Sequence, residues 1–138
     1  LADQITKYYA DVYKILLYPP LEIFSWLNIV YVENKGISFG ILSTLNISFY
    51  LGLLSFVVSF YIIYLLKKSK KKTEKIALSL ILGGALGNGI DRVVREYVID
   101  FIDISLNNMH WPAFNIADSS ITVGGILYFW LIIFKKNQ

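Results

Sequence analysis

The sequence predicts an all-α membrane protein: a helical transmembrane bundle with a small extracytoplasmic β-structured region. Hydrophobic residues make up 56% of the 138 residues and charged residues only 17%, whereas soluble domains hold roughly 45–50% apolar and about 25% charged residues. Three apolar stretches approach or exceed the roughly 20 residues that cross a bilayer as a helix. We therefore expect a single membrane-embedded domain over residues 1–138 with three visible spans.

Residues 1–44 form the predicted extracytoplasmic segment. Its first residues fit a short polar helix, which Pro19 and Pro20 interrupt. The stretch FSWLNIVYVEN that follows is rich in β-branched and aromatic residues, which is typical of one or two short strands. Open strand edges are tolerated outside the hydrocarbon core but not within it. This segment is therefore the expected source of the β-structure.

The first predicted span covers residues 45–66 and contains no charged residue. It ends at Lys67, where the lysine cluster KKSKKKTEK (residues 67–75) begins. Short loops rich in lysine remain on the cytoplasmic side of a membrane. The lysine cluster is therefore predicted to be a cytoplasmic loop.

The second predicted span covers residues 76–94. Its uncharged part, IALSLILGGALGNGI, is about 15 residues long, which is short for a complete crossing. Asn88, Asp91 and Arg92 are therefore expected within the outer part of the membrane. The closely spaced glycines allow another helix to approach closely.

The third predicted span covers residues 113–134 and is followed by Lys135 and Lys136. Three spans place the two ends of the chain on opposite sides of the membrane. If the lysine cluster is cytoplasmic, the C-terminal lysines are cytoplasmic as well and Leu1 is outside. The loop between the second and third spans is then extracytoplasmic.

The composition excludes several kinds of chemistry. With no cysteine and one histidine, the chain has no material for disulfides, thiolate nucleophiles or histidine-rich metal sites. GISFG at Gly36–Gly40 matches the G-x-S-x-G elbow of serine hydrolases. That elbow needs an α/β sheet and a histidine partner. Here a membrane span follows the motif and His110 is the one histidine, so we reject the serine-hydrolase interpretation. We expect no metal site. We interpret His110 as a residue of an interfacial loop, and we attribute the net charge of +3 to clustered lysines rather than to a nucleic-acid partner.

Two aspartates are the first candidates for catalysis, because an ionisable residue within a membrane is costly and is therefore a functional-site candidate. Asp100 in YVIDFID and Asp118 in FNIADSS have apolar neighbours near the outer ends of neighbouring spans. Two carboxyl groups that meet in one pocket share a proton, so one can activate water while the other polarises a carbonyl. The alternative for Asp118, a helix N-cap, stays open.

Other polar residues near these aspartates have open roles. Arg92 pairs with the carboxylate site or with a lipid phosphate, or else Asp91 and Arg92 form a structural ion pair. Asp103 fits a solvated loop acid. Three amides beside apolar spans are either structural links or holders of a substrate peptide: Asn34, Asn88 and Asn115.

Five motifs resemble one family, the lipoprotein signal peptidases (signal peptidase II), in the family's order and spacing and over nearly the whole chain. They are DQITK at Asp3–Lys7, NKGISFG at Asn34–Gly40, GGALGNGIDR at Gly83–Arg92, VIDFID at Val98–Asp103 and FNIADSSITVG at Phe114–Gly124. Two positions depart from the family pattern. Ile37-Ser38 stands where two alanines are usual, and Gly89 stands where a bulkier apolar residue is common.

The resemblance implies four membrane helices with both termini in the cytoplasm. Because the family's DQ-x-T-K motif closes its first helix, that helix is expected to lie before Leu1. The resemblance also implies that Asp100 and Asp118 are the catalytic pair. It implies substrate-binding or site-supporting roles for Asp3, Lys7, Asn34, Asn88, Arg92 and Asn115.

The implied protein is an aspartic endopeptidase of the bacterial inner membrane with its active site at the extracytoplasmic face. It would remove signal peptides from diacylglyceryl-modified prolipoproteins by cleaving before the lipid-modified cysteine. It would contact membrane lipid, need no cofactor and act as a monomer. On the residues alone two other classes stay open: a small membrane transporter or channel subunit, and a non-catalytic membrane adaptor that would tolerate the loss of both aspartates.

Overall fold

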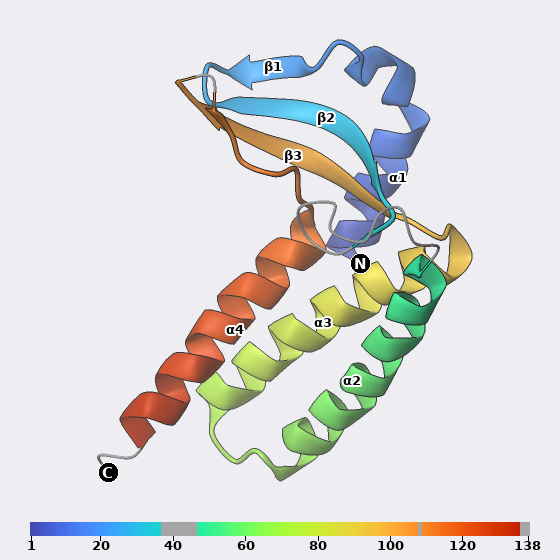
Figure 1. Ribbon diagram of the computed structural model, residues 1–138. Helices are drawn as coiled ribbons and strands as arrows, with labels where there is room; N and C mark the ends of the chain where they lie inside the picture. The colour runs from blue at the N-terminus through green and yellow to red at the C-terminus, as the bar shows by residue number, and fades with distance from the viewer. Residues whose placement is uncertain (37–46, 108, 136–138) are drawn as a thin grey trace.

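In the computed structural model, which describes residues 1–36, 47–107 and 109–135, a bundle of long helices carries a sheet and a short helix at one end (Figure 1). The long helices are α2 (Ser48–Lys68), α3 (Lys72–Val94) and α4 (Ile116–Lys135). At about 1.5 Å per residue each is roughly 30–35 Å long. All three are long and apolar enough to cross a membrane, which confirms the predicted transmembrane bundle.

The helix boundaries differ by a few residues from those predicted. The second span begins at Lys72 rather than at residue 76, so only Ser69–Lys71 connect α2 to α3. Glu74 lies in the first turn of α3, where the partial positive charge of a helix N-terminus favours an acidic residue. The third span begins at Ile116 rather than at residue 113, while residues 45 and 46 of the first lie outside the described residues.

Close approach of α3 and α4 depends on glycine at two positions. A Cβ atom at position 84 would collide with the carbonyl oxygen of Ala117 on α4, and one at position 124 would lie 2.7 Å from the carbonyl oxygen of Ala77 on α3. Small residues allow such contact between membrane helices, where van der Waals packing drives association. Among the described helices, two neighbours therefore use the glycines of α3: α4 approaches at Gly84, and α2 approaches at Gly89, where a Cβ atom would lie 3.0 Å from Cβ of Ser55.

We expect Gly84→Ala to lower the free energy of unfolding by about 1–3 kcal/mol, because the added methyl group forces α3 away from Ala117. Gly83→Ala is the matched control, since a Cβ atom there has no neighbour within 4 Å among the described residues. Unfolding of both variants in detergent measures the difference. Equal effects of the two substitutions would contradict this account of the packing.

The sheet contains four antiparallel strands in the order β1-β2-β3-β4. They are β1 (Leu21–Phe24), β2 (Leu27–Asn34), β3 (Val98–Leu106) and β4 (Met109–His110). The strand β2 lies within the predicted FSWLNIVYVEN stretch, so the expected β-structured region is present. No strand is predicted from the sequence for residues 98–106 and 109–110, which form β3 and β4. The structure differs there, because β3 pairs with β2 over six residue pairs.

A short helix packs beneath this sheet and brings two site residues with it (Figure 1). The helix α1 (Ala2–Val12) buries Asp3, Lys7 and Ala10 along one face. Ala10 and Leu17 form an apolar core with Ile99 and Phe101 of β3, while Asp3 and Lys7 face the membrane helices. The further membrane helix that the resemblance implies would lie before Leu1, outside the described residues.

Candidate active site

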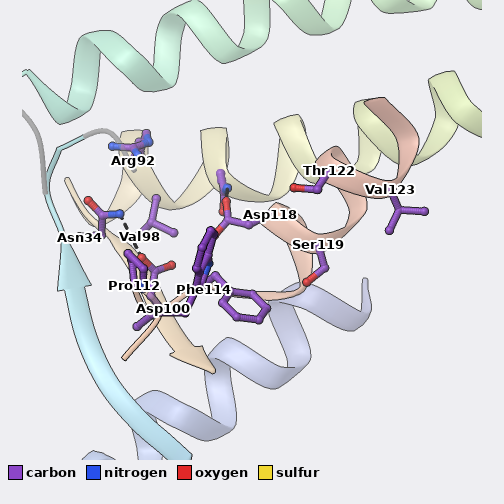
Figure 2. Close-up of a pocket in the computed structure, with 13 residues that line it drawn as sticks. Asn34, Arg92, Val98, Asp100, Pro112, Phe114, Asp118, Ser119, Thr122 and Val123 are labelled. Atoms are coloured by element: carbon purple, nitrogen blue, oxygen red, sulfur yellow. Dashed lines mark hydrogen bonds between the residues drawn. The ribbon is translucent and has the colours of Figure 1, made fainter. Parts of the chain in front are cut away.

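The site is a cavity of about 490 Å³ where the sheet meets the ends of α3 and α4. Five of the eight predicted site residues line it: Asn34, Asn88, Arg92, Asp100 and Asp118. Both candidate aspartates therefore border one space, although one comes from a strand and the other from a helix (Figure 2). The remaining three, Asp3, Lys7 and Asn115, lie directly behind this layer and contact it.

Asp100 lies on β3 with only 2% of its surface exposed. In the antiparallel register Val32 faces Asp100, so Asn34 is its diagonal neighbour on β2. The Asn34 amide donates to Oδ2 at 3.0 Å and the Asn115 amide donates to Oδ1 at 2.7 Å. Burial raises the pKa of Asp100 to about 6; the two amides oppose that rise and the charge of Asp118 adds to it.

This pKa has a measurable consequence for stability. Between pH 4 and 6 the folded protein holds a proton on Asp100 that the unfolded chain releases, so the contribution of Asp100 to stability falls as the pH rises through this range. We expect the free energy of unfolding of Asp100→Asn, relative to the wild type, to rise between pH 4 and 6 and then to level off. A rise from 3.8 to about 6 corresponds to roughly 3 kcal/mol.

Unfolding titrations in detergent at several pH values test this. Because wild type and variant are compared at each pH, the contributions of the other carboxyl groups to the free energy of unfolding cancel. A difference that stays constant from pH 4 to 7 would contradict the raised pKa.

Asp118 lies in the first turn of α4, and its carboxylate takes part in the cap of that helix. The Asn115 side-chain oxygen accepts from the backbone N–H of Asp118 at 2.9 Å, while Asp118 Oδ2 accepts from the backbone N–H of Asn115 at 3.2 Å. This is the reciprocal arrangement of a capping box. The other oxygen, Oδ1, accepts from the Asn88 amide at 2.8 Å. The N-cap of α4 is therefore Asn115 and not Asp118. Asp118 completes the capping box from the third helical position while it borders the cavity.

The three asparagines act as structural links between the two carboxyl groups. Asn115 is shared, because its amide nitrogen donates to Asp100 and its oxygen accepts from the backbone of Asp118. Asn88 donates to the Asp118 carboxyl group, and Asn34 donates to the Asp100 carboxyl group. Within the described residues, all three amides therefore contact a candidate aspartate, and Asn34 and Asn88 also line the cavity.

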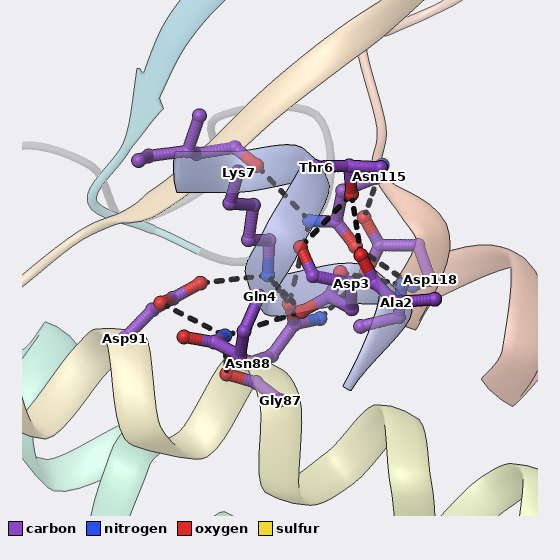
Figure 3. Close-up of polar contacts among 12 residues, drawn as sticks. Ala2, Asp3, Gln4, Thr6, Lys7, Gly87, Asn88, Asp91, Asn115 and Asp118 are labelled. Atoms are coloured by element: carbon purple, nitrogen blue, oxygen red, sulfur yellow. Dashed lines mark hydrogen bonds and ion pairs between the residues drawn. The ribbon is translucent and has the colours of Figure 1, made fainter. Parts of the chain in front are cut away.

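A buried cluster of charges lies behind this layer (Figure 3). The Lys7 ammonium is fully buried and reaches Asp91 Oδ2 at 2.6 Å, Asn88 Oδ1 at 2.8 Å and Asp3 Oδ2 at 2.9 Å. These are three partners for its three N–H groups. Because Lys7 occupies the oxygen of Asn88, the amide nitrogen of Asn88 is turned towards Asp118. Asp3 also accepts from the backbone N–H of Ala117 at 2.8 Å.

Asp91 was missed as a site-supporting residue and is central to this cluster. It is 0% exposed and pairs with Lys7 and, at 2.6 Å, with Arg95. Arg92 lines the cavity instead and donates to the carbonyl oxygen of Gly36 at 2.7 Å. The hypothesis of a structural pair between Asp91 and Arg92 is therefore wrong, because adjacent residues on a helix point in different directions. The four residues after Gly36 in the GISFG motif lie outside the described residues.

Two further predictions are corrected at the rim of the sheet. Asp103 is buried on β3 and is not a solvated loop acid. It accepts from the Asn28 amide at 2.8 Å and lies 2.9 Å from Nδ1 of His110. His110 is exposed but lies on β4 rather than in a loop. Across the described ranges, no group of three or more histidine or carboxylate side chains is placed to hold a metal ion.

Comparisons with known proteins identify the family to which this chain belongs. The family model for signal peptidase (SPase) II matches residues 1–134. A lipoprotein signal peptidase of Thermodesulfovibrio yellowstonii is 45% identical over 93% of this chain and 84% of that protein, and one of Psychromonas ingrahamii is 41% identical over 98% and 80%.

Solved structures agree with these relatives. A bacterial membrane enzyme determined by the in meso method at 2.3 Å resolution superposes with a TM-score of 0.83 at 34% identity, covering 99% of this chain and 84% of that one. A second, at 1.9 Å resolution, gives 0.71 at 32% identity, covering 94% and 88%. With three membrane helices among its described residues, this multi-pass bacterial membrane protein belongs to the signal peptidase II family.

Proposed function

We propose that this protein is an aspartic endopeptidase that removes signal peptides from diacylglyceryl-modified prolipoproteins, cleaving before the lipid-modified cysteine, with Asp100 and Asp118 as its catalytic pair. The observation that carries the proposal is the placement of both carboxyl groups in one cavity, joined by Asn115. The names of the relatives support the substrate class.

The proposed reaction needs one proton on the pair. Like charges held close together do not both ionise readily, and the raised pKa of Asp100 keeps a proton there to higher pH than on an ordinary aspartate. The ionised carboxylate takes a proton from water, which attacks the scissile carbonyl carbon, while the protonated carboxyl group donates to the carbonyl oxygen. The pair then holds one proton, now on the carboxyl group that took it from water. That group donates this proton to the leaving nitrogen as the C–N bond breaks, while the other carboxylate takes back the proton of the intermediate's hydroxyl group, so the pair ends with one proton.

The surroundings of the pair suit a substrate that reaches it through the bilayer. Val98, Phe114 and Val123 give the cavity apolar walls, and Ser119 and Thr122 continue it along the first turns of α4 (Figure 2). A signal helix and a diacylglyceryl group both lie in lipid, so a cavity at the end of a membrane helix is accessible to both.

The experiment that tests the proposal compares two prolipoprotein peptides that differ only in the diacylglyceryl group on the cysteine. Full-length purified protein in detergent is expected to cleave the lipidated peptide and to leave the other intact. Equal cleavage of both would contradict the proposed substrate class. A transporter or an adaptor, the two alternatives, would cleave neither, and nothing in the family relationship favours them.

We further propose that the protein lies in the inner membrane with the cavity at its extracytoplasmic face, because the lysines cluster at the opposite end of the bundle. Single cysteines are informative since the chain has none. Lys70→Cys and Leu106→Cys are suitable because both positions are exposed. A membrane-impermeant thiol reagent applied to intact cells is expected to label position 106 only. Labelling of both, or of position 70 alone, would refute this topology.

A further inference from the structure

At the end of the bundle away from the sheet, α2 joins α3 and α4 ends (Figure 1). Two hollows meet there. One, of about 260 Å³, is bordered by Lys71, Glu74 and the aromatic and aliphatic side chains of the last turns of α4. The other, of about 430 Å³, is bordered by Leu65, Lys68–Lys71 and again Glu74. Because Lys71 and Glu74 border both, the hollows form one continuous surface.

The charge of this surface is unbalanced. Lys68, Lys70 and Lys71 border it, and Glu74 is its single acidic residue. Glu74 accepts from the hydroxyl group of the buried Ser69 at 3.1 Å, which fixes the short connection between the helices. Lys68 extends over the ring of Tyr64. Within the described part of the chain, Lys70 and Lys71 have no ion-pair partner, so Glu74 leaves an excess of positive charge on this surface.

The apolar part of the surface follows α4 into the membrane. Trp130, Leu131 and Phe134 line the smaller hollow, with Tyr128 nearer the middle of the helix. A ligand that satisfies both parts needs an anionic group beside the lysines and an aliphatic chain along α4. Free phosphate would satisfy the first part only, and a zwitterionic lipid carries its own cation beside the phosphate.

We propose that this surface, defined by Lys68, Lys70, Lys71, Glu74, Trp130 and Phe134, is a binding site for an anionic phospholipid of the adjacent leaflet. The headgroup phosphate lies between Lys70 and Lys71, and one acyl chain follows Trp130 and Phe134. Anionic lipid surfaces attract neighbouring lysines strongly enough to change affinity roughly fivefold per residue. The site is separate from the peptidase cavity and takes no part in cleavage.

Trp130 provides the measurement, because it lines the site. Full-length protein with Trp26→Phe and Trp111→Phe retains Trp130 as its single tryptophan within residues 1–138. Its fluorescence is measured in neutral detergent during titration with phosphatidylglycerol or phosphatidylcholine that carry identical brominated acyl chains. We expect phosphatidylglycerol to quench at a concentration at least fivefold lower.

Matched variants separate a defined site from general attraction to a basic loop. Lys70→Gln with Lys71→Gln is expected to weaken phosphatidylglycerol binding about 25-fold. Lys67→Gln with Lys75→Gln removes the same charge from the same cluster, but neither residue borders the hollows, so binding is expected to change far less. Glu74→Gln, which can still accept from Ser69, is expected to tighten binding severalfold.

Three results would overturn the proposal: equal quenching by the two lipids, equal loss in the two double variants, or no quenching of Trp130 by either lipid. The readout is lipid binding, so its outcome is independent of whether the protein cleaves prolipoproteins.

Discussion

Asp100→Asn and Asp118→Asn are each expected to lower the rate of prolipoprotein cleavage by about 1,000-fold or more while the protein stays folded. General acid–base catalysis by a positioned group contributes roughly 10²–10⁴-fold, and neither proton transfer in the proposed reaction has a substitute. Asparagine has nearly the same shape as aspartate, so packing around the cavity is retained. Single-turnover cleavage of a lipidated peptide gives the rates.

A double variant distinguishes a catalytic pair from two independent contributions. Groups that act as a unit are non-additive, so Asp100→Asn with Asp118→Asn is expected to be no slower than either single variant. Glu33→Gln is the matched control, because Glu33 is an exposed carboxylate on β2 next to Asn34 but does not line the cavity. Its rate is expected to equal that of the wild type. Rates of the single variants within tenfold of wild type would contradict the assignment.

Lys7→Met is expected to lower the free energy of unfolding by about 3–5 kcal/mol. Removal of one partner of a buried ion pair leaves an uncompensated charge, and that cost exceeds the interaction lost. Here the variant leaves Asp3 and Asp91 facing each other without the ammonium that lies 2.9 and 2.6 Å from them. Asn88 also loses the donor that orients its amide towards Asp118, so cleavage is expected to fall together with stability.

Lys14→Met is the matched control for this variant. Lys14 follows the same helix and pairs with Asp11 at 3.2 Å, but half of its side chain is exposed. Exposed ion pairs contribute about 0–1 kcal/mol, so the control is expected to unfold almost as the wild type does. Chemical unfolding of both variants in one detergent measures the contrast. Similar losses would show that the burial of Lys7 does not matter.

The membrane helices could be predicted from the sequence because hydropathy is a local property. Residues 48–66 contain no charged side chain, and whether they form a membrane helix depends little on the rest of the chain. The sequence predicts a start of α3 that is four residues too late, because a lysine cluster beside an apolar stretch indicates a loop, although KTEK is compatible with a helix. The lysines bound the apolar stretch of α3, but the helix itself extends through Lys75 to Lys72.

The strands β3 and β4 could not be recognised in the same way, because pairing partners are far apart in the sequence. Asp100 pairs with Val32, 68 positions away, and nothing local indicates this. One signal was available: the dipeptide Asn107-Asn108 between two apolar stretches. Asparagine tolerates the positive φ that tight turns require, and Asn107 has φ of 49°. That signal predicts a hairpin and would have brought His110 close to Asp103.

The residues of the candidate site also differ in whether local sequence identifies them. The two aspartates could be named because apolar neighbours made them unusual, and the motifs added their supporting residues. Asp91 was missed because its partner Lys7 lies on α1, 84 positions earlier. A buried lysine needs a counter-charge, so the sequence required a partner for Lys7 without identifying it.

The most direct test of the central claim is the mass of the cleavage products. Purified full-length protein is incubated with a diacylglyceryl-modified prolipoprotein, and the products are identified by mass spectrometry. The account predicts two products whose masses place the break immediately before the lipid-modified cysteine, and neither product with Asp100→Asn or Asp118→Asn. An intact substrate with the wild-type protein, or a break at another peptide bond, would contradict it.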